Sequence, residues 1–459
     1  MKFSPDIDLR ESRRIHLVGI GGAGMGPIAQ ILNAEGHVVT GTDASVSPMT
    51  QRLEELGIAV TIGDGADLAG VDLLGCSTAV SEDHPLVLEA DRRGILVVGR
   101  FGLLRCLGAL KSTLSVSGTH GKTTTSALVA HILDAAGRNP SFLVGALVHG
   151  LGTTCAWTGS SEFVLEADES DATFLAPPRA GAIVTNIDAD HLDFYGSFEA
   201  LLNAFDEFVD GTDGPVVVCG DDEFSRRYSG RNNVITYGRS TDNDVVISEL
   251  VSQGSTSTWN VTGAGLESQF TLGVPGVHLV LNATAAAILC RSLGVTDDDI
   301  AMGLSRYRSA SRRFESRGNF DGISLIDDYA HMPVEVETVL DAARQITSGR
   351  VIAVFQPHRY SRTKHVWQDF DTSFVDADVV VVTEIYAAGE TPIDGLSGSM
   401  IADRVRRNHD GEVVFVESLD KAAEWLNAHL RSGDTCVTLG AGDITRLPDL
   451  VLASQGGAR

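Results

Sequence analysis

Residues 112–137 read STLSVSGTHGKTTTSALVAHILDAAG, and this stretch decides the fold of the middle of the chain. An apolar, alternating run ends at Ser117, a glycine-rich segment follows at residues 118–121, and an apolar period then predicts a helix that ends at Gly137. A strand that leads through a glycine-rich loop into a helix is typical of a phosphate site, because the loop amides and the helix start point at the anion. The stretch therefore predicts a nucleotide-binding loop in an α/β domain.

The polar residues of this loop suit a phosphate site. Lys122 is expected to reach the terminal phosphates of a nucleotide, and the hydroxyl of Thr123 is expected to bind Mg²⁺. The loop departs from the usual G-x-x-x-x-G-K-S/T pattern, because Val116 stands where the first glycine is expected. We expect the loop to bind ATP through Gly118, Thr119, His120, Gly121, Lys122, Thr123 and Thr124.

A second glycine-rich segment, GIGGAG at residues 19–24, lies between a predicted strand and a predicted helix. Asp43 ends the next predicted strand, and this spacing is typical of a dinucleotide-binding fingerprint. Glycines let backbone amides approach a diphosphate, which NAD, FAD or a UDP-sugar would each supply. The segment thus indicates a bound diphosphate without saying which one, and a tight turn without a ligand is the plainer alternative.

The rest of the chain repeats the alternation of strands and helices. Short β-branched runs alternate with amphipathic stretches from residue 14 to about 100 and again from about 318 onwards, which predicts parallel sheets with crossover helices. From residue 216 to 274 the runs are short, Thr-rich and bounded by turns, which predicts an antiparallel patch. We expect an α/β protein of three domains: an N-terminal Rossmann-like parallel sheet (1–108), a central P-loop ATPase-type domain with an antiparallel patch (109–316) and a C-terminal Rossmann-like domain (317–459).

The composition excludes several classes of protein. With 35 Lys and Arg against 61 Asp and Glu, the net charge is −26, and such a field repels nucleic acid and anionic lipid. No run approaches the roughly 20 apolar residues that span a bilayer, so we expect no membrane insertion. The six cysteines are scattered and the N-terminus does not read as a signal peptide. These features predict a cytoplasmic protein that binds no nucleic acid. They do not decide between a monomer and a homodimer.

The wording of both loops, and the order of several later segments, resembles the Mur ligase family. This resemblance implies an ATP-dependent amide ligase of peptidoglycan synthesis that uses Mg²⁺. The member of the family that HLVGIGGAGM resembles implies a reaction in which L-alanine is joined to the lactyl carboxylate of UDP-N-acetylmuramic acid through an acyl phosphate. The segments in family order are HLVGIGGAGM (16–25), GTHGKTT (118–124), EADESDATFL (166–175), TNIDADHLD (185–193), DDYAHMP (327–333), FQPHRYSRT (355–363) and GAGD (440–443).

Two predicted strand ends supply candidate metal ligands. Glu166 ends an apolar strand in the domain of Thr123, where a carboxylate suits Mg²⁺. His191 follows the next strand and is the second metal residue by resemblance to the family. Many members carry a carbamylated lysine shortly after this histidine, but residues 191–210 contain no lysine, so that role is excluded here.

The resemblance implies further binding residues. Asn282, at the head of a predicted helix, is expected to read adenine, although Leu279 replaces an asparagine common in the family. Paired arginines can bind a carboxylate bidentately, which makes Arg359 and Arg362 candidates for the alanine carboxylate. The expected sets are Gly21, Gly22, Gly24, Met25, Asp43 and Ser77 for the UDP-sugar; Asn282, Arg313 and Asp328 for ATP beyond the loop; Tyr329, His358, Arg359 and Arg362 for alanine; and Lys122, Glu166, His191, Arg313 and His331 for catalysis.

Three alternatives stay open. A ligase of the same family that adds a preformed tripeptide to the same UDP-sugar shares both loops, although residues 357–363 (PHRYSRT) favour free alanine. A nicotinamide-dependent oxidoreductase explains residues 14–43 but leaves the second loop without a role. A mechanical ATPase explains residues 113–191 but leaves the first loop without one.

Overall fold

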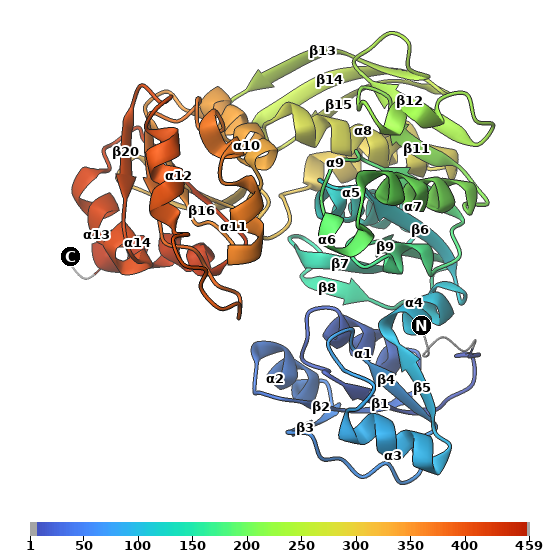
Figure 1. Cartoon of the computed structure of the whole chain (residues 1–459). Helices are drawn as coiled ribbons and strands as arrows, with labels where there is room; N and C mark the ends of the chain where they lie inside the picture. The colour runs from blue at the N-terminus through green and yellow to red at the C-terminus, as the bar shows by residue number, and fades with distance from the viewer. Residues whose placement is uncertain (1–6, 457–459) are drawn as a thin grey trace. The chain divides into compact units, whose positions relative to one another are not determined.

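A computed structural model describes residues 7–456 of the chain, and its strands form three sheets (Figure 1). The expected α/β class with three sheets is confirmed, while the predicted boundaries near residues 108 and 316 stay a prediction. The chain divides into two compact units, one of Met1–Ser248, Asn260–Gln269 and Asn282–Arg306, and one of Glu249–Trp259, Phe270–Leu281 and Tyr307–Arg459.

The first sheet has five parallel strands in the order β3-β2-β1-β4-β5. The order changes direction between β1 and β4, so the loops after these strands lie at a topological switch point, where such sheets bind ligands. This confirms the Rossmann-like sheet. Its strands are β1 (Arg14–Val18), β2 (Val38–Asp43), β3 (Ala59–Ile62), β4 (Leu73–Cys76) and β5 (Leu96–Gly99), and its helices are α1 (Met25–Ala34), α2 (Pro48–Glu55), α3 (Pro85–Arg93) and α4 (Arg100–Gly108).

The central sheet has ten strands in the order β15-β14-β13-β12-β11-β10-β6-β9-β7-β8. Its buried middle strand β6 pairs in parallel with β9 and β10, so their carboxyl ends meet at one edge. The strands are β6 (Ser112–Ser117), β7 (Ser141–Val148), β8 (Thr153–Ala156), β9 (Glu162–Glu166), β10 (Gly181–Val184), β11 (Val216–Cys219), β12 (Val234–Gly238), β13 (Val245–Gln253), β14 (Thr256–Gly263) and β15 (Leu266–Leu272). The helices are α5 (Lys122–Ala135), α6 (Leu192–Tyr195), α7 (Phe198–Asp210), α8 (Val277–Ser292) and α9 (Asp297–Arg306), with 3-10 turns η1 (Thr173–Leu175) and η2 (Ser225–Tyr228).

The antiparallel patch is narrower than the sequence predicts. β11 and β12 lie within the expected patch, but both pair in parallel: β11 with β10 and β12, and β12 also with β13. Only β13, β14 and β15 are joined by the short turns of a meander. On the opposite side of the sheet β7 and β8 form an antiparallel pair that the sequence analysis did not predict.

The third sheet has six strands in the order β16-β17-β21-β18-β19-β20. Five are parallel, as a Rossmann-like domain requires, but the edge strand β16 runs antiparallel to β17, which the sequence analysis did not predict. The strands are β16 (Glu315–Phe320), β17 (Ile323–Asp328), β18 (Val351–Phe355), β19 (Val379–Val382), β20 (Glu412–Phe415) and β21 (Thr435–Leu439). The helices are α10 (Pro333–Ile346), α11 (Tyr360–Val366), α12 (Gly398–Val405), α13 (Leu419–His429) and α14 (Leu447–Gly456), with 3-10 turns η3 (Asp369–Asp371) and η4 (Asp443–Arg446).

Each sheet has apolar side chains buried around it, and the polar segments singled out in the sequence follow strand ends. No helix in the described part of the chain is long and apolar enough to cross a membrane. The six cysteines are all buried and unpaired with one another. The loops at the carboxyl edges of the sheets are therefore the places to look for chemistry.

Candidate active site

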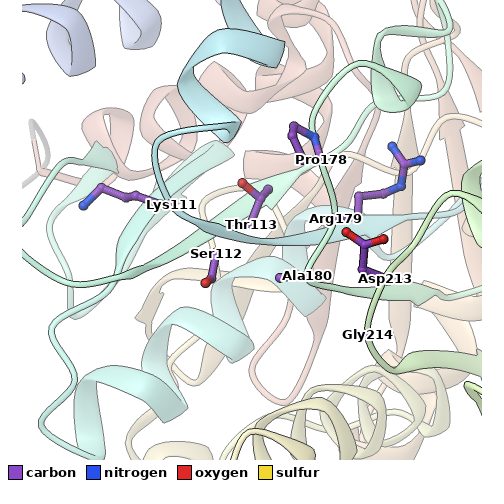
Figure 2. Close-up of a pocket in the computed structure, with 8 residues that line it drawn as sticks. All are labelled: Lys111, Ser112, Thr113, Pro178, Arg179, Ala180, Asp213 and Gly214. Carbon is purple, nitrogen blue, oxygen red and sulfur yellow. The ribbon is translucent and has the colours of Figure 1, made fainter. Parts of the chain in front are cut away.

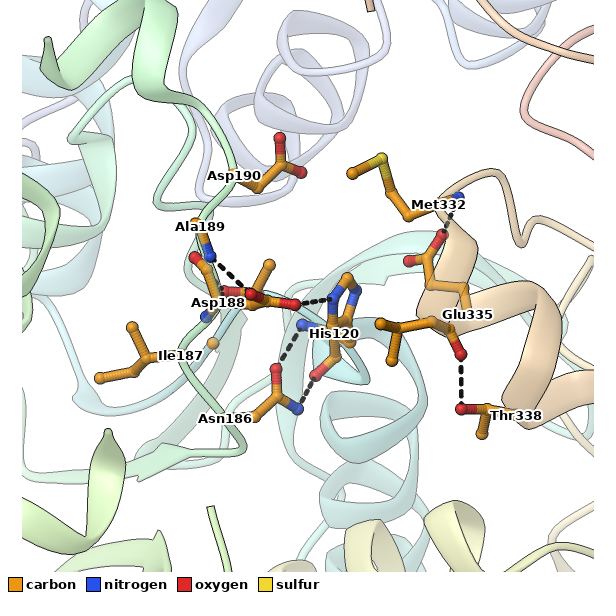
Figure 3. Close-up of polar contacts among 12 residues, drawn as sticks. His120, Asn186, Ile187, Asp188, Ala189, Asp190, Met332, Glu335 and Thr338 are labelled. Atoms are coloured by element: carbon orange, nitrogen blue, oxygen red, sulfur yellow. Dashed lines mark hydrogen bonds and ion pairs between the residues drawn. The ribbon is translucent and has the colours of Figure 1, made fainter. Parts of the chain in front are cut away.

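The glycine loop between β6 and α5 is fixed by the end of β10. Gly121, the N-cap of α5, has φ +84° and Gly118 has φ +130°, a region that favours glycine. The hydroxyl of Thr185 donates to the His120 carbonyl at 2.6 Å, and the Asn186 side chain both donates to that carbonyl and accepts the His120 amide at 2.9 Å (Figure 3). The loop is thus tied to the end of the neighbouring strand by three hydrogen bonds.

Lys122 lies folded over this loop. Its ammonium donates to the carbonyl oxygens of Gly118 at 2.7 Å and Thr119 at 3.1 Å, and to Glu169 Oε1 at 2.8 Å. Burial alone would lower the pKa of Lys122, but the carboxylates of Glu169 and Asp168 outweigh burial and raise it. Glu169 is only 1% exposed, and its second oxygen has no hydrogen-bond partner. The sequence analysis missed Glu169, whose only signal was its place in the EADESDATFL segment.

Two of the three predicted metal residues lie together. The hydroxyl of Thr123 donates to Glu166 Oε1 at 2.8 Å, and the amide of Gly145 donates to the other carboxylate oxygen at 2.5 Å. A hydroxyl and a carboxylate are oxygen donors of the kind that Mg²⁺ prefers next to nucleotide phosphates. Within residues 7–456, no cluster of three or more His, Cys, Asp or Glu side chains is arranged to bind a metal ion. The metal role of His191 stays a prediction.

His191 lies instead beside the Lys122 pair. It is the N-cap of the short helix α6 with φ +56°, and its Nε2 is 3.7 Å from Glu169 Oε1 and 3.5 Å from Asp190 Oδ2. On the same loop Asp188 faces His120, with Oδ2 and Nε2 3.7 Å apart (Figure 3). This contact with His120 lowers the pKa of Asp188. The loop after β10 thus presents acidic and imidazole groups to the phosphate loop.

Asn282 packs against the phosphate loop. A Cβ atom on Gly121 would lie 2.7 Å from Asn282 Oδ1, and the Asn282 side chain is only 7% exposed. The structure thus places the predicted adenine reader next to the predicted phosphate site. A contact with the adenine base itself stays a prediction.

The first glycine loop is packed tightly against its own domain. The amide of Gly21 donates to Asp43 Oδ2 at 2.8 Å, and a Cβ on Gly19 would lie 2.9 Å from Ser77 Oγ. Met25 is 1% exposed, and its amide donates to the Gly22 carbonyl at 3.1 Å. The predicted UDP-sugar residues are therefore brought together at one edge of the sheet, and Asp43 binds the loop itself.

Arg100 also contacts this loop, which the sequence analysis missed. Gly22 lies in the turn, where its amide donates to the Gly19 carbonyl at 3.2 Å, and Gly24 is the N-cap of α1. A Cβ on Gly24 would lie 2.9 Å from Arg100 Nε. Because Arg100 is far from the loop in sequence, no local motif marks it.

Asp328 and Arg313 lie at the carboxyl end of β17. Asp328 accepts the amides of Phe314 at 2.6 Å and Ala330 at 2.8 Å, and burial raises its pKa to about 6. The Arg313 guanidinium lies 4.9 Å from the centre of the Tyr329 ring. Asp328 thus binds the backbone just before β16 and just after β17. A contact between Asp328 and ATP stays a prediction.

Arg312, which was not in the predicted site set, organises the GAGD segment. Its guanidinium donates to the carbonyls of residues 440–442, pairs with Asp327 at 3.5 Å and lies 4.9 Å from the Tyr329 ring centre. Asp327 is fully buried and also accepts hydroxyl donors. This network fixes the loop after β21 beside β17.

The predicted alanine residues gather around His358. Arg362 donates to His358 Nδ1 at 3.2 Å, the His331 ring centre is 6.0 Å from that of His358, and the Tyr386 ring stacks on His358 at 5.7 Å. An arginine can only donate, so Nδ1 accepts and the ring is neutral. Burial, helped by His331 and the nearby arginines, lowers the pKa of His358 to about 4. Tyr386 is a further residue that the sequence analysis missed.

Arg359 and His331 complete this group. Arg359 is exposed, has φ +67° and donates its amide to the Tyr386 carbonyl at 2.8 Å. The Tyr329 ring meets the His331 ring edge-on at 5.4 Å. Glu335 accepts the His331 amide at 2.9 Å and the Met332 amide at 3.0 Å, the second of which is drawn in Figure 3. The second unit thus presents two arginines and three aromatic rings around one neutral histidine.

A pocket of about 370 Å³ lies at the opposite edge of the central sheet (Figure 2). It is formed at the amino ends of β6, β10 and β11, away from the glycine loop. The Arg179 guanidinium in it is already bound to the carbonyls of Phe208 and Pro177 at 3.2 and 2.9 Å. It is lined by Lys111, Ser112, Thr113, Pro178, Arg179, Ala180, Asp213 and Gly214. None of these residues belongs to the predicted site.

Comparison with known protein families matches almost the whole chain. Residues 14–111 match the model "Mur ligase family, catalytic domain", residues 116–290 match "Mur ligase middle domain" and residues 312–442 match "Mur ligase, glutamate ligase domain". This chain belongs to the Mur ligase family.

Individual relatives agree. A UDP-N-acetylmuramate–L-alanine ligase of Rhodopseudomonas palustris (strain TIE-1) is 41% identical over 94% of this chain and 95% of its own. One of Nitrobacter winogradskyi is 42% identical over 95% of this chain and 96% of its own. The crystal structure of UDP-N-acetylmuramate-alanine ligase MurC from Thermotoga maritima aligns with a TM-score of 0.83 and 28% identity, covering 97% of this chain and 100% of that one. The sequence-based assignment to the family is confirmed.

Proposed function

We propose that this chain is an ATP-dependent ligase that joins L-alanine to the lactyl carboxylate of UDP-N-acetylmuramic acid in peptidoglycan precursor synthesis. Two relatives that are named for this activity match the chain over nearly its full length. The observation that carries the proposal is the meeting of Lys122, Thr123 and Glu166 at the carboxyl edge of the central sheet. The proposed small-molecule partners are UDP-N-acetylmuramate, L-alanine and ATP, and we expect the enzyme to act in the cytoplasm as a monomer or homodimer.

The reaction that fits these residues has two steps. The lactyl carboxylate attacks the γ-phosphorus of ATP, the bond to ADP breaks and an acyl phosphate forms. The neutral amine of alanine then attacks the acyl carbon, and the tetrahedral intermediate loses a proton and expels phosphate to leave the amide. Lys122 and the loop amides stabilise the negative charge of the phosphoryl group during the first step.

Mg²⁺ fits the oxygen donors at this edge. Thr123 and Glu166 would bind it, and the ion would neutralise phosphate charge. The 2.8 Å approach of their oxygens shows that both side chains point at one place. His191, near Glu169, would contribute to a second ion only after the side chains rearrange.

Alanine is proposed to bind in the second unit. Arg359 is exposed and Arg362 is oriented by His358, so the pair can accept the alanine carboxylate. His358 and Tyr386 form a flat wall beside it, which suits a small apolar side chain.

Product analysis tests the proposal. ADP and phosphate should form only when UDP-N-acetylmuramate and L-alanine are both present with ATP and Mg²⁺. A panel of free amino acids and one tripeptide separates this activity from the tripeptide ligase of the same family. Release of ADP with the tripeptide but not with alanine would contradict the proposal, and so would turnover without the UDP-sugar.

A further inference from the structure

Arg100 lies where the first sheet presents its ligand edge. It directly follows β5 and begins α4, and all five strands of this sheet are parallel, so it shares an edge with the loop at residues 19–24. Its side chain lies against the start of α1. A Cβ on Gly24 would be 2.9 Å from Nε and 3.2 Å from Cζ of Arg100. The guanidinium thus lies beside the start of α1, where the amides of Met25 and Gly26 donate to the Gly22 carbonyl.

The guanidinium has donors left for a ligand. Nη1 of Arg100 donates to Asp171 Oδ2 at 3.3 Å, while Nε is buried without a hydrogen-bond partner. A guanidinium carries five N–H donors in a planar fork. The side chain is 21% exposed, so a bound molecule can reach it. The exposed N–H groups of a guanidinium beside a glycine-rich loop suit an anionic oxygen.

Other cations of this domain are engaged away from the loop. Arg52 pairs with its helix neighbour Glu55, and Arg93 pairs with Glu89 on α3. The Lys111 ammonium donates to two carbonyls at the amino edge of the central sheet. In a chain of net charge −26, a diphosphate needs a local positive charge, and Arg100 supplies one at the loop.

We propose that Arg100 binds the diphosphate of the UDP-sugar, and that Asp171 is a positioning residue that orients its guanidinium. The inference rests on the proposed function and adds a residue to its UDP-sugar site. Arg100 donates to the phosphate oxygens through the exposed part of its guanidinium, while Nη1 keeps its bond to Asp171. The amides of Gly19, Gly21 and Gly22 already donate to acceptors within the domain, so the guanidinium supplies donors that these amides do not.

Titration of the full-length protein with UDP, uridine and ADP tests this role. Losing a charge-assisted contact should weaken UDP binding about tenfold to a hundredfold in Arg100→Gln. Uridine and ADP should bind as in the wild type, because neither needs this contact. The UDP affinity of Arg100→Lys should lie between those of the wild type and Arg100→Gln, since a lysine keeps the charge but loses the planar fork of donors. Arg52→Gln removes the same charge from an exposed ion pair, so this control should bind UDP as tightly as the wild type does.

Asp171 supplies a second readout. Asp171→Asn should weaken UDP binding less than Arg100→Gln, and it should have no further effect when Arg100 is already replaced. Unchanged UDP affinity in Arg100→Gln overturns the inference, and so does an equal loss of UDP, uridine and ADP, which marks a structural role. A wild-type protein that binds ADP but no UDP overturns the proposed function as well, so the two failures are distinguishable.

Discussion

Lys122 shares its ammonium among two loop carbonyls and one buried carboxylate, so it links the phosphate loop to the segment after β9. The two loop contacts follow from the motif, because a lysine after Gly121 begins α5. The contact with Glu169 does not follow from the motif. It joins the loop after β6 to the segment after β9, which come together only in the folded chain. At this scale the sequence predicts the residue that acts and misses the residue that pairs with it.

Replacement of Lys122 should separate catalysis from stability. Lys122→Ala should abolish ligation, leave UDP-sugar binding nearly intact and lower the free energy of unfolding by about 3–5 kcal/mol, because Glu169 is left buried and unpaired. Adding Glu169→Gln should recover much of that stability but no activity. Turnover assays and urea denaturation of the single and double variants check this. Near-normal turnover in Lys122→Ala would contradict the assignment of the ATP site.

His358 predicts a pH dependence of stability. Its pKa is about 4 in the folded chain against 6.5 for an unperturbed histidine. Between these values the unfolded chain binds a proton that the folded chain does not, so this contribution to stability is lost as pH falls from 6.5 towards 4. The wild type should therefore lose more unfolding free energy than His358→Gln when urea denaturation is repeated below pH 6.5. The same pH dependence in both proteins would show that His358 titrates normally.

The two arginines near His358 should govern alanine affinity. Either Arg359→Ala or Arg362→Ala removes one charge-assisted contact, typically about 1.5–3 kcal/mol, so the KM for alanine should rise about tenfold to a hundredfold. Acyl-phosphate formation, followed by positional isotope exchange in ATP, should persist because it precedes amine attack. If exchange disappears while alanine affinity is unchanged, the pair acts in phosphoryl transfer.

Elements that follow one another in sequence were predictable, and pairings between distant elements were not. The strand, loop and helix at residues 112–137 follow from local glycine and apolar spacing. Whether β11 and β12 pair in parallel depends on where the chain returns to the sheet, which their similar sequences do not encode. The antiparallel edge strand β16 was missed because ESRGNF has little apolar alternation. The contacts of Arg312 with residues 440–442 were likewise not predictable, because they join segments that are far apart in the sequence.

The tie between β10 and the phosphate loop makes Gly118 sensitive. Its φ is +130°, and a Cβ there would collide with the Thr185 side chain, so Gly118→Ala should displace the loop. We expect ADP binding to fall at least about tenfold, with UDP binding unchanged, since a strained or clashing backbone costs on the order of 1–3 kcal/mol. Gly159→Ala is the matched control, because a Cβ at Gly159 meets nothing within 4 Å. Equal ADP affinity in Gly118→Ala and Gly159→Ala would show that the phosphate loop tolerates a side chain facing Thr185 and would contradict this prediction.

At the scale of the whole molecule, the three sheets were predictable from three stretches in which strands and helices alternate. The division of the chain into two compact units was not predictable. The second unit takes in residues 249–259 and 270–281, which lie in strands and a helix that the sequence assigns to the central domain. Such a division follows from packing between segments distant in sequence. No composition shift or linker marks it in the sequence.

The core of the third sheet nevertheless lies within a continuous part of the chain. Its buried cluster runs from Ile323 to Val451, and its strands pair only with one another among the described residues. We therefore expect residues 307–459, which are within the usual size of a domain, to fold alone with one cooperative urea transition followed by circular dichroism. The fragment should be less stable than in the full chain, because it lacks residues 270–281, where a Cβ on Gly276 would lie 3.1 Å from Ala342 Cβ on α10. Val354→Ala, which opens a cavity in the same cluster, should lower the transition midpoint further. A broad, noncooperative loss of signal in the wild-type fragment would show that the third sheet needs the missing segments to fold.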